Sequence, residues 1–304
     1  MQRGNLHRDV AAGNVLRLLQ SSERAEFTPY NIFAMLEGQR EANGKHHKWT
    51  REEASIVAGE DPVRVALLKL AGELQGLVQK LDITTLCNAI LTDGDLSAPL
   101  GDYFESRQTY NTLSVSHLDG FLRLKFITRV QGTREFMSDQ LREAILRPND
   151  DGYFHGPIDD LMAMFWTVLY GVLNSNNSRN FSGGEEEEAR RLSWAGADRE
   201  DVFKGILGAS YSDKRLSQIM QATFRVLKKW KRFLEELMSA WLQLVEFAQE
   251  ERMSLEELSV PFYTYAYRGV IGLLQLVAED QAHQPTKQIH LIAPDIAPTS
   301  GPTV

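Results

Sequence analysis

The sequence predicts an all-α fold, an irregular multi-helix bundle in two lobes with an extended C-terminal arm. Three observations lead to this expectation. Apolar residues recur at the spacing of a helix face over several long segments. Residues that favour helix starts precede these segments, and alternating strand patterns are nearly absent. The contents of hydrophobic residues, 43%, and of charged residues, 24%, are those of a globular protein with a buried core.

The first predicted helices begin at capping residues. Thr28 precedes Pro29, and proline favours the first position of a helix because that position needs no backbone N–H. Thr50 and Glu53 have the spacing of a capping box, in which each side chain bonds to the backbone amide of the other residue. Asp61 precedes a proline and opens a third helix. The predicted apolar face of that helix holds Val63, Leu67, Leu70, Leu74, Leu77 and Leu81.

The most apolar segment follows Pro157 and runs to Leu173. A helix that is hydrophobic on nearly all sides is usually buried, so we expect this one at the centre of a core. Its apolar run from Leu161 to Leu173 holds 13 residues, whereas a helix that crosses a bilayer needs about 20. The sequence therefore predicts no membrane span.

One long helix is predicted from Ser212 to Gln249, with a length of about 57 Å at about 1.5 Å per residue. Its apolar residues follow alternating steps of four and three, and Lys231 interrupts them. A capping box at Ser254 and Glu257 opens a short turn, which Pro261 is expected to separate from a last helix. The apolar seam of the long helix comprises Met220, Phe224, Leu227, Leu234, Met238, Trp241, Val245 and Ala248.

The polar run at 174–188, rich in Asn, Ser, Gly and Glu, predicts a linker or exposed loop. It divides the chain into an N-terminal helical lobe, 1–173, and a C-terminal helical lobe, 189–280. The last stretch, 281–304, holds four prolines and few charges, and we expect an extended arm there. Disorder is one interpretation of this arm. The other is a contact with a neighbouring subunit, because four large apolar side chains are costly to leave in water: Ile289, Leu291, Ile292 and Ile296.

Several classes of protein are disfavoured. Cys87 is the only cysteine, which excludes an intrachain disulfide and a multi-cysteine zinc site. We expect this thiol on a helix, as part of the core. The net charge of −8 disfavours a protein that coats duplex DNA through bulk positive charge. The first residues are polar and show no signal-peptide core, so the expected location is intracellular and cytoplasmic, or the virion if the protein is viral.

Catalytic signatures are missing from the sequence: it has no phosphate loop, no dinucleotide fingerprint, no zinc-protease helix and no nucleophile elbow. His155, Asp159 and Asp160 lie close in sequence and could form an acid–base cluster. Aspartates are also common at helix N-termini because they interact favourably with the helix dipole. We therefore predict no enzyme, no cofactor and no metal.

The most informative pattern is a set of four cations on the long helix. Arg225, Lys228, Lys229 and Arg232 share one face, opposite the apolar seam. A solvated surface, with acidic partners elsewhere, is one interpretation. A strip that binds a phosphate backbone is the other. Further candidates for such an interface are Lys45, Lys48, Arg123 and Arg129.

Three functions remain open. The leading hypothesis is a self-assembling structural subunit, a homo-oligomer joined by the arm, which encloses single-stranded RNA in a local basic groove. Viral nucleocapsid and capsid proteins have comparable architectures, although no motif is shared. The second hypothesis is a monomeric or dimeric helical adaptor or regulator that binds a protein partner. The third is a helical enzyme with a site near Asp159 and Asp160.

Overall fold

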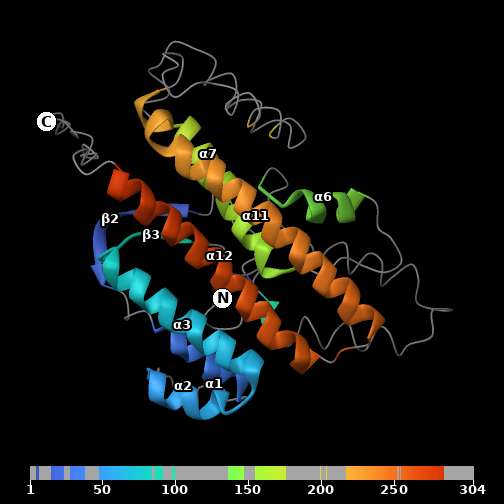
Figure 1. Ribbon diagram of the computed structural model, residues 1–304. Coiled ribbons are helices and arrows are strands. Elements are labelled where there is room, and N and C mark those ends of the chain that lie inside the picture. Colours follow the sequence, from blue (N-terminus) through green and yellow to red (C-terminus); the bar gives the residue numbers. More distant parts are fainter. Residues whose placement is uncertain are drawn as a thin grey trace, which may run out of the picture.

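The described part of the chain is built mainly from helices (Figure 1). All statements on structure below concern the residues that the computed structural model describes. These are residues 5–6, 15–23, 28–37, 48–83, 86–91, 98–99, 136–146, 155–175, 199, 203, 217–251, 253 and 255–283.

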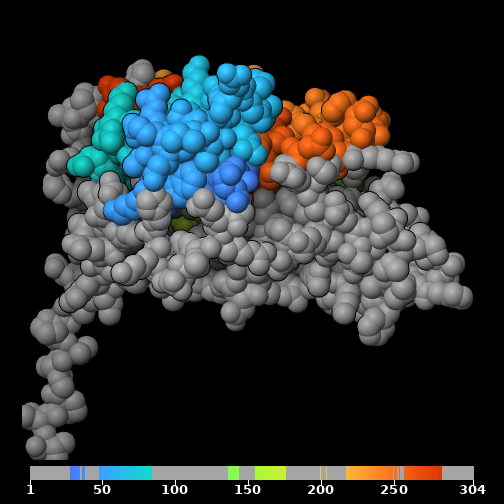
Figure 2. Space-filling model, turned by 90° about the horizontal axis from the view of Figure 1, so that it is seen from below, coloured from blue at the N-terminus to red at the C-terminus, as the bar shows by residue number. Residues whose placement is uncertain are grey.

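Short helices form the N-terminal part of the bundle. The 3-10 turn η2 (Pro29–Asn31) runs into α1 (Ile32–Leu36), which confirms the start at the proline, although the side chain of Thr28 makes no capping hydrogen bond. Helix α2 (Arg51–Ala58) has the predicted capping box, with hydrogen bonds in both directions between Thr50 and Glu53. Helix α3 (Pro62–Lys80) begins after Asp61, whose carboxylate accepts a hydrogen bond from the N–H of Val63. Figure 2 shows α2 and α3 together on one face of the molecule, in blue to cyan.

The most apolar helix is central, as predicted. Helix α7 (Pro157–Leu173) buries Phe165 and Leu169 completely. Helix α6 (Asp139–Leu146) lies near its N-terminal end. The aromatic rings of Phe165 and Trp166 meet edge to face, and the ring of Trp230 contacts Phe165 in the same geometry. Edge-to-face contacts of this kind stabilise a core beyond the area that they bury.

The long helix α11 (Gln218–Glu250) begins later than the predicted Ser212. The hydroxyl of Ser217 accepts a hydrogen bond from the N–H of Met220 at 3.2 Å, as a residue that caps a helix does. The seam prediction holds in most positions, because Phe224, Leu227 and Trp241 are buried. The residue predicted to interrupt the seam is also buried, since Lys231 is 3% exposed.

Helix α12 (Leu255–His283) corrects two expectations. Pro261 lies inside it, so the predicted turn before Phe262 is wrong. A proline removes one backbone hydrogen bond, but its neighbours Val260 and Phe262 are both buried, and their packing favours a continuous helix. The helix also reaches His283, so residues 281–283 of the predicted arm are helical. The remaining arm residues, 284–304, lie outside the described part of the chain.

Two small antiparallel strand pairs accompany the helices. Strand β2 (Val15–Glu23) pairs with β3 (Leu86–Leu91), and β1 (Asn5–Leu6) pairs with β4 (Ala98–Pro99). The expectation that Cys87 lies on a helix is therefore wrong. A short apolar run fits a strand as well as a helix. Here the run forms a strand because it pairs with the distant segment β2.

One hydrophobic core joins helices α1, α2, α3, α7, α11 and α12 of the described part. Helix α12 packs against α3 on one side and against α11 and α7 on the other (Figure 1). Helices from both sides of the predicted linker thus contribute to the same core. Most of that linker lies outside the described residues, and the division into two lobes stays a prediction.

Candidate nucleic-acid interface on helix α11

The four cations of α11, Arg225, Lys228, Lys229 and Arg232, form an exposed strip, which we call the cation strip. All four residues are exposed. The seam residues on the other side of the helix are buried, with Leu234 and Trp241 fully inside, except Val245, which is partly buried. The predicted geometry of the face is therefore confirmed, since the side chains that bind the core and the side chains that carry charge lie on opposite sides.

Two cations of the strip have acidic partners. The Lys229 amine lies 2.8 Å from a carboxylate oxygen of Glu279 on α12. The Arg232 guanidinium lies 3.1 Å from Glu236, one turn along the same helix. All four side chains of these pairs are about half exposed or more, and exposed pairs of this kind contribute at most about 1 kcal/mol.

The other two cations, Arg225 and Lys228, have no ion-pair partner among the described residues. Arg225 and Lys229 line a small hollow between α11 and α12, together with Val226, Leu276, Glu279 and Asp280. The strip thus offers two cations without an acidic partner and two whose charge is partly offset. An arrangement of this kind can bind anions through charge, without reading the identity of a base.

The remaining predicted cations do not join the strip in the described part of the chain. Lys48 is exposed just before α2. Helix α2 packs on α3, α3 on α12 and α12 on α11, so two helices separate Lys48 from the strip (Figure 1). Lys45, Arg123 and Arg129 lie outside the described residues. So do the four predicted subunit contacts, Ile289, Leu291, Ile292 and Ile296.

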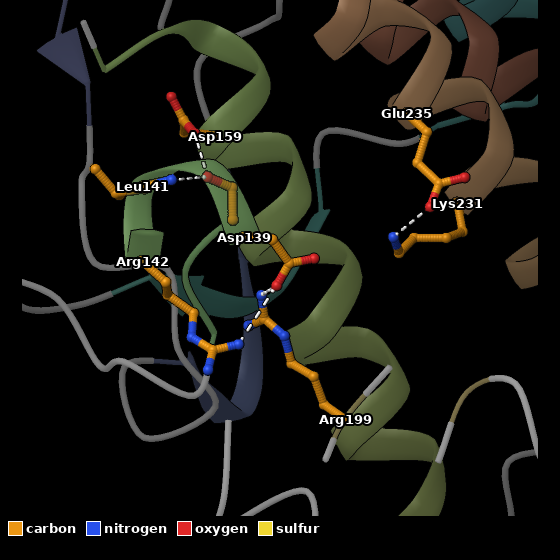
Figure 3. Close-up of polar contacts among 8 residues, drawn as sticks. Asp139, Leu141, Arg142, Asp159, Arg199, Lys231 and Glu235 are labelled. Atoms are coloured by element: carbon orange, nitrogen blue, oxygen red, sulfur yellow. Dashed lines mark hydrogen bonds and ion pairs between the residues drawn. The ribbon is translucent and has the colours of Figure 1, made fainter. Parts of the chain in front are cut away.

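The carboxylate of Asp159 links two helix starts (Figure 3). One oxygen accepts a hydrogen bond from the N–H of Gly156 at 2.7 Å, at the start of α7. The other accepts from the hydroxyl of Ser138, and that hydroxyl oxygen accepts from the N–H of Leu141 at 3.1 Å, at the start of α6. These contacts are those of helix capping.

His155 lies beside Asp160 rather than Asp159. Its Nε2 is 3.2 Å from a carboxylate oxygen of Asp160, and the two residues are each 5% exposed. The three residues proposed for acid–base chemistry are therefore buried, and they are divided between a capping carboxylate and a separate buried pair. The geometry fits helix anchoring better than contact with a substrate.

Sequence reasoning missed a buried cationic cluster around Trp166. The guanidinium of Arg199 lies 4.4 Å from the centre of the indole ring, and the Lys231 amine lies 5.3 Å from it. Arg199 is ion-paired with Asp139, which also faces Arg142, and Lys231 is 2.7 Å from Glu235 (Figure 3). The spacing of Lys231 and Glu235, one helical turn apart, is a signal that could have indicated the second pair. No local sequence pattern could have predicted the ion pair between Arg199 and Asp139.

Within the residues that the structure describes, no three His, Cys, Asp or Glu side chains come together as a metal site would require. Among the helices of that same part, none is both long enough and apolar enough to cross a membrane. Comparison with known proteins gives no relative: the chain matches no protein-family model, no curated protein and no solved structure.

Proposed function

We propose that this chain is a self-assembling helical subunit that contacts the phosphate backbone of single-stranded RNA through the cation strip of α11. The observation that carries the proposal is the division of α11 into a buried seam and an exposed strip with two cations, Arg225 and Lys228, that form no ion pair with a described acid. A cation that has no acidic partner can release counterions from a phosphate backbone, which is the main driving force for nonspecific binding.

Because the net charge is −8, RNA binding by this protein requires a local positively charged surface. Long-range attraction to RNA is weak for an acidic protein, so binding depends on a surface that concentrates positive charge. The strip has the length for this, because Arg225 to Arg232 span about 10 Å of helix at 1.5 Å per residue. That length covers the phosphates of a few nucleotides.

The assembly part of the proposal starts from the end of α12. Residues 284–304 follow directly on α12, whose last turns carry Glu279 and Asp280 beside the cation strip. The last residue of α12, His283, thus follows about one helical turn after the acids that line the hollow beside the strip. An apolar segment that starts there and binds a neighbouring subunit would bring successive strips near one another along one RNA strand.

The test is charge reversal at the two cations that lack an acidic partner. We expect Arg225→Glu with Lys228→Glu to weaken the binding of a labelled oligouridylate at low salt by about tenfold or more. The matched control is Arg51→Glu with Lys69→Glu, which changes the net charge equally at two exposed positions on α2 and α3. Fluorescence anisotropy gives the affinities, and circular dichroism checks that both variants keep the fold.

The salt dependence gives a second readout of the same proposal. The logarithm of the wild-type affinity should fall with the logarithm of the salt concentration by about 0.7 per phosphate contact, and the charge-reversed protein should show a shallower slope. Equal affinities and slopes for the variant and its control would contradict the placement of the site. Sequence preference should be slight, because ammonium and guanidinium groups aimed at phosphates read charge.

An adaptor that binds a protein partner is the second candidate. It is favoured by two apolar side chains one turn apart on α7, Met164 and Val168, which are 38% and 40% exposed on a helix that is otherwise largely buried. Exposed apolar surface on a buried helix is typical of a docking site. Absence of RNA binding by the wild-type protein at low salt would favour this candidate.

A further inference from the structure

The acidic end of α12 lies against the cation strip. Glu279 is ion-paired with Lys229 at 2.8 Å, and both Glu279 and Asp280 line the hollow that Arg225 and Lys229 line from the other side. The contact therefore joins two helices at positions 50 residues apart in the chain. It places two negative charges where a phosphate would have to approach two of the four cations.

The placement of these acids opposes the dipole of their own helix. Glu279 and Asp280 lie in the last turn and a half of α12, which ends at His283. The C-terminal end of a helix carries a partial negative charge, so acidic side chains there lose about 0.3–1 kcal/mol instead of gaining it. For Glu279, the ion pair with Lys229 of α11 offsets this unfavourable interaction.

We propose that Glu279 and Asp280 act as a competing anion that lowers the affinity of the cation strip for RNA. This inference rests on the function proposed above. A phosphate that binds Lys229 has to displace Glu279, and a phosphate beside Arg225 has to tolerate Asp280. Because an exposed ion pair contributes at most about 1 kcal/mol, RNA can displace it, and the acids adjust the affinity without closing the site.

The test neutralises the two acids. Glu279→Gln with Asp280→Asn should tighten the binding of a labelled oligouridylate at low salt by about three- to tenfold, since both an ion pair and a repulsive charge are lost. The salt slope should steepen by about 0.7, the value for one further phosphate contact on a single strand. The matched control is Glu246→Gln with Glu250→Gln, which makes the same change in net charge at exposed positions farther along α11.

The outcomes separate the two proposals. Tighter RNA binding by the α12 variant, with less than a twofold change in affinity for the control, supports competition between the two acids and RNA. RNA binding that is detected only in the α12 variant supports it as well. Unchanged affinity in the α12 variant, with a wild-type protein that binds RNA, overturns the competition and leaves the proposed function standing. Equal tightening in both variants also overturns it, because net charge then explains the effect. Failure of the wild type and both variants to bind overturns the proposed function and the competition together.

Discussion

Two glycines of α12 determine how closely the neighbouring helices approach it. A Cβ added at Gly272 would overlap the ring of Phe233 on α11, and one added at Gly269 would overlap the end of the Leu161 side chain on α7. Gly76 on α3 differs, because a Cβ there would meet no atom within 4 Å. The same substitution should therefore have opposite effects at these positions.

We expect Gly272→Ala to destabilise the protein by about 1–3 kcal/mol, because the added methyl group would meet the rigid ring of Phe233, which is packed against the core. Gly269→Ala should cost less, since the end of a leucine side chain can change its rotamer. Gly76→Ala should stabilise by about 0.5–1 kcal/mol through helix propensity. Urea unfolding measures all three, and a gain in stability for Gly272→Ala would contradict the close approach of α11 and α12.

Two buried tyrosines of α12 make the stability depend on alkaline pH. Burial raises the pKa of Tyr263 from 10.0 to about 12. Burial also raises the pKa of Tyr267, and the neighbouring Tyr263 raises it further. The Tyr267 hydroxyl donates a hydrogen bond to the carbonyl of Pro29 at 2.5 Å, which ties α12 to η2. Both groups are thus held in the protonated form by the fold.

A raised pKa means that the unfolded chain loses its protons first as the pH rises. The stabilising contribution of Tyr263 is therefore complete below pH 10 and is lost between pH 10 and about pH 12. The free energy of unfolding should fall there by about 1.4 kcal/mol per pH unit for each such tyrosine. Tyr263→Phe should show a shallower fall in urea unfolding over this range. An unchanged slope would mean that Tyr263 ionises as readily in the folded protein as in the unfolded chain.

At the scale of helices, the loss of different capping residues should lower the free energy of unfolding by different amounts. Thr50 caps α2 at the surface, whereas Asp159 is 1% exposed and serves the starts of both α6 and α7. A buried polar group that loses its hydrogen-bond partner cannot form a replacement hydrogen bond with water. The two caps therefore allow a direct comparison within one protein.

We expect Thr50→Ala to cost about 1 kcal/mol and Asp159→Ala to cost about 2–4 kcal/mol in the free energy of unfolding. Ser55→Ala is the control, because Ser55 is exposed within α2 and alanine favours a helix. Thermal or urea unfolding gives the three values. A cost for Asp159→Ala no larger than that for Thr50→Ala would contradict the double cap.

The sequence predicted the elements whose signals are local. The capping box of α2, the proline start of α7 and the seam of α11 depend on residues within a few turns of each other; the first two are confirmed, and the seam is buried at every predicted position but Val245, which is partly buried. The errors concern long-range contacts. Strand β3 forms because it pairs with β2, and α12 continues through Pro261 while the flanking side chains pack in the core.

The same distinction applies to the candidate site. Periodicity placed Arg225, Lys228, Lys229 and Arg232 on one exposed face, because a helix fixes the positions of side chains seven residues apart. Periodicity could not predict that Glu279 of α12 forms an ion pair with Lys229 of the neighbouring helix α11. Nor could it predict that Lys231 is buried, with its amine over the ring of Trp166. Charge pairs between distant segments depend on the packing of the whole bundle.

At the scale of the whole molecule, helices α1, α2, α3, α7, α11 and α12 of the described part share a hydrophobic core, and the cation strip lies exposed on α11. The core includes helices from both halves of the chain, so removal of the arm should leave it intact. Deletion of residues 284–304 should therefore lower the oligomeric state and preserve the helical circular dichroism signal. The truncation keeps His283, since α12 extends to that residue.

Self-assembly with bound RNA is tested by size-exclusion chromatography with light scattering and absorbance at 260 and 280 nm. The chromatography is run on the full chain and on the chain truncated after His283. We expect the full chain to elute as a multiple of 34.4 kDa with excess absorbance at 260 nm, and the truncated chain to elute as a smaller species. A full chain that elutes as a monomer with the absorbance ratio of pure protein would contradict this expectation.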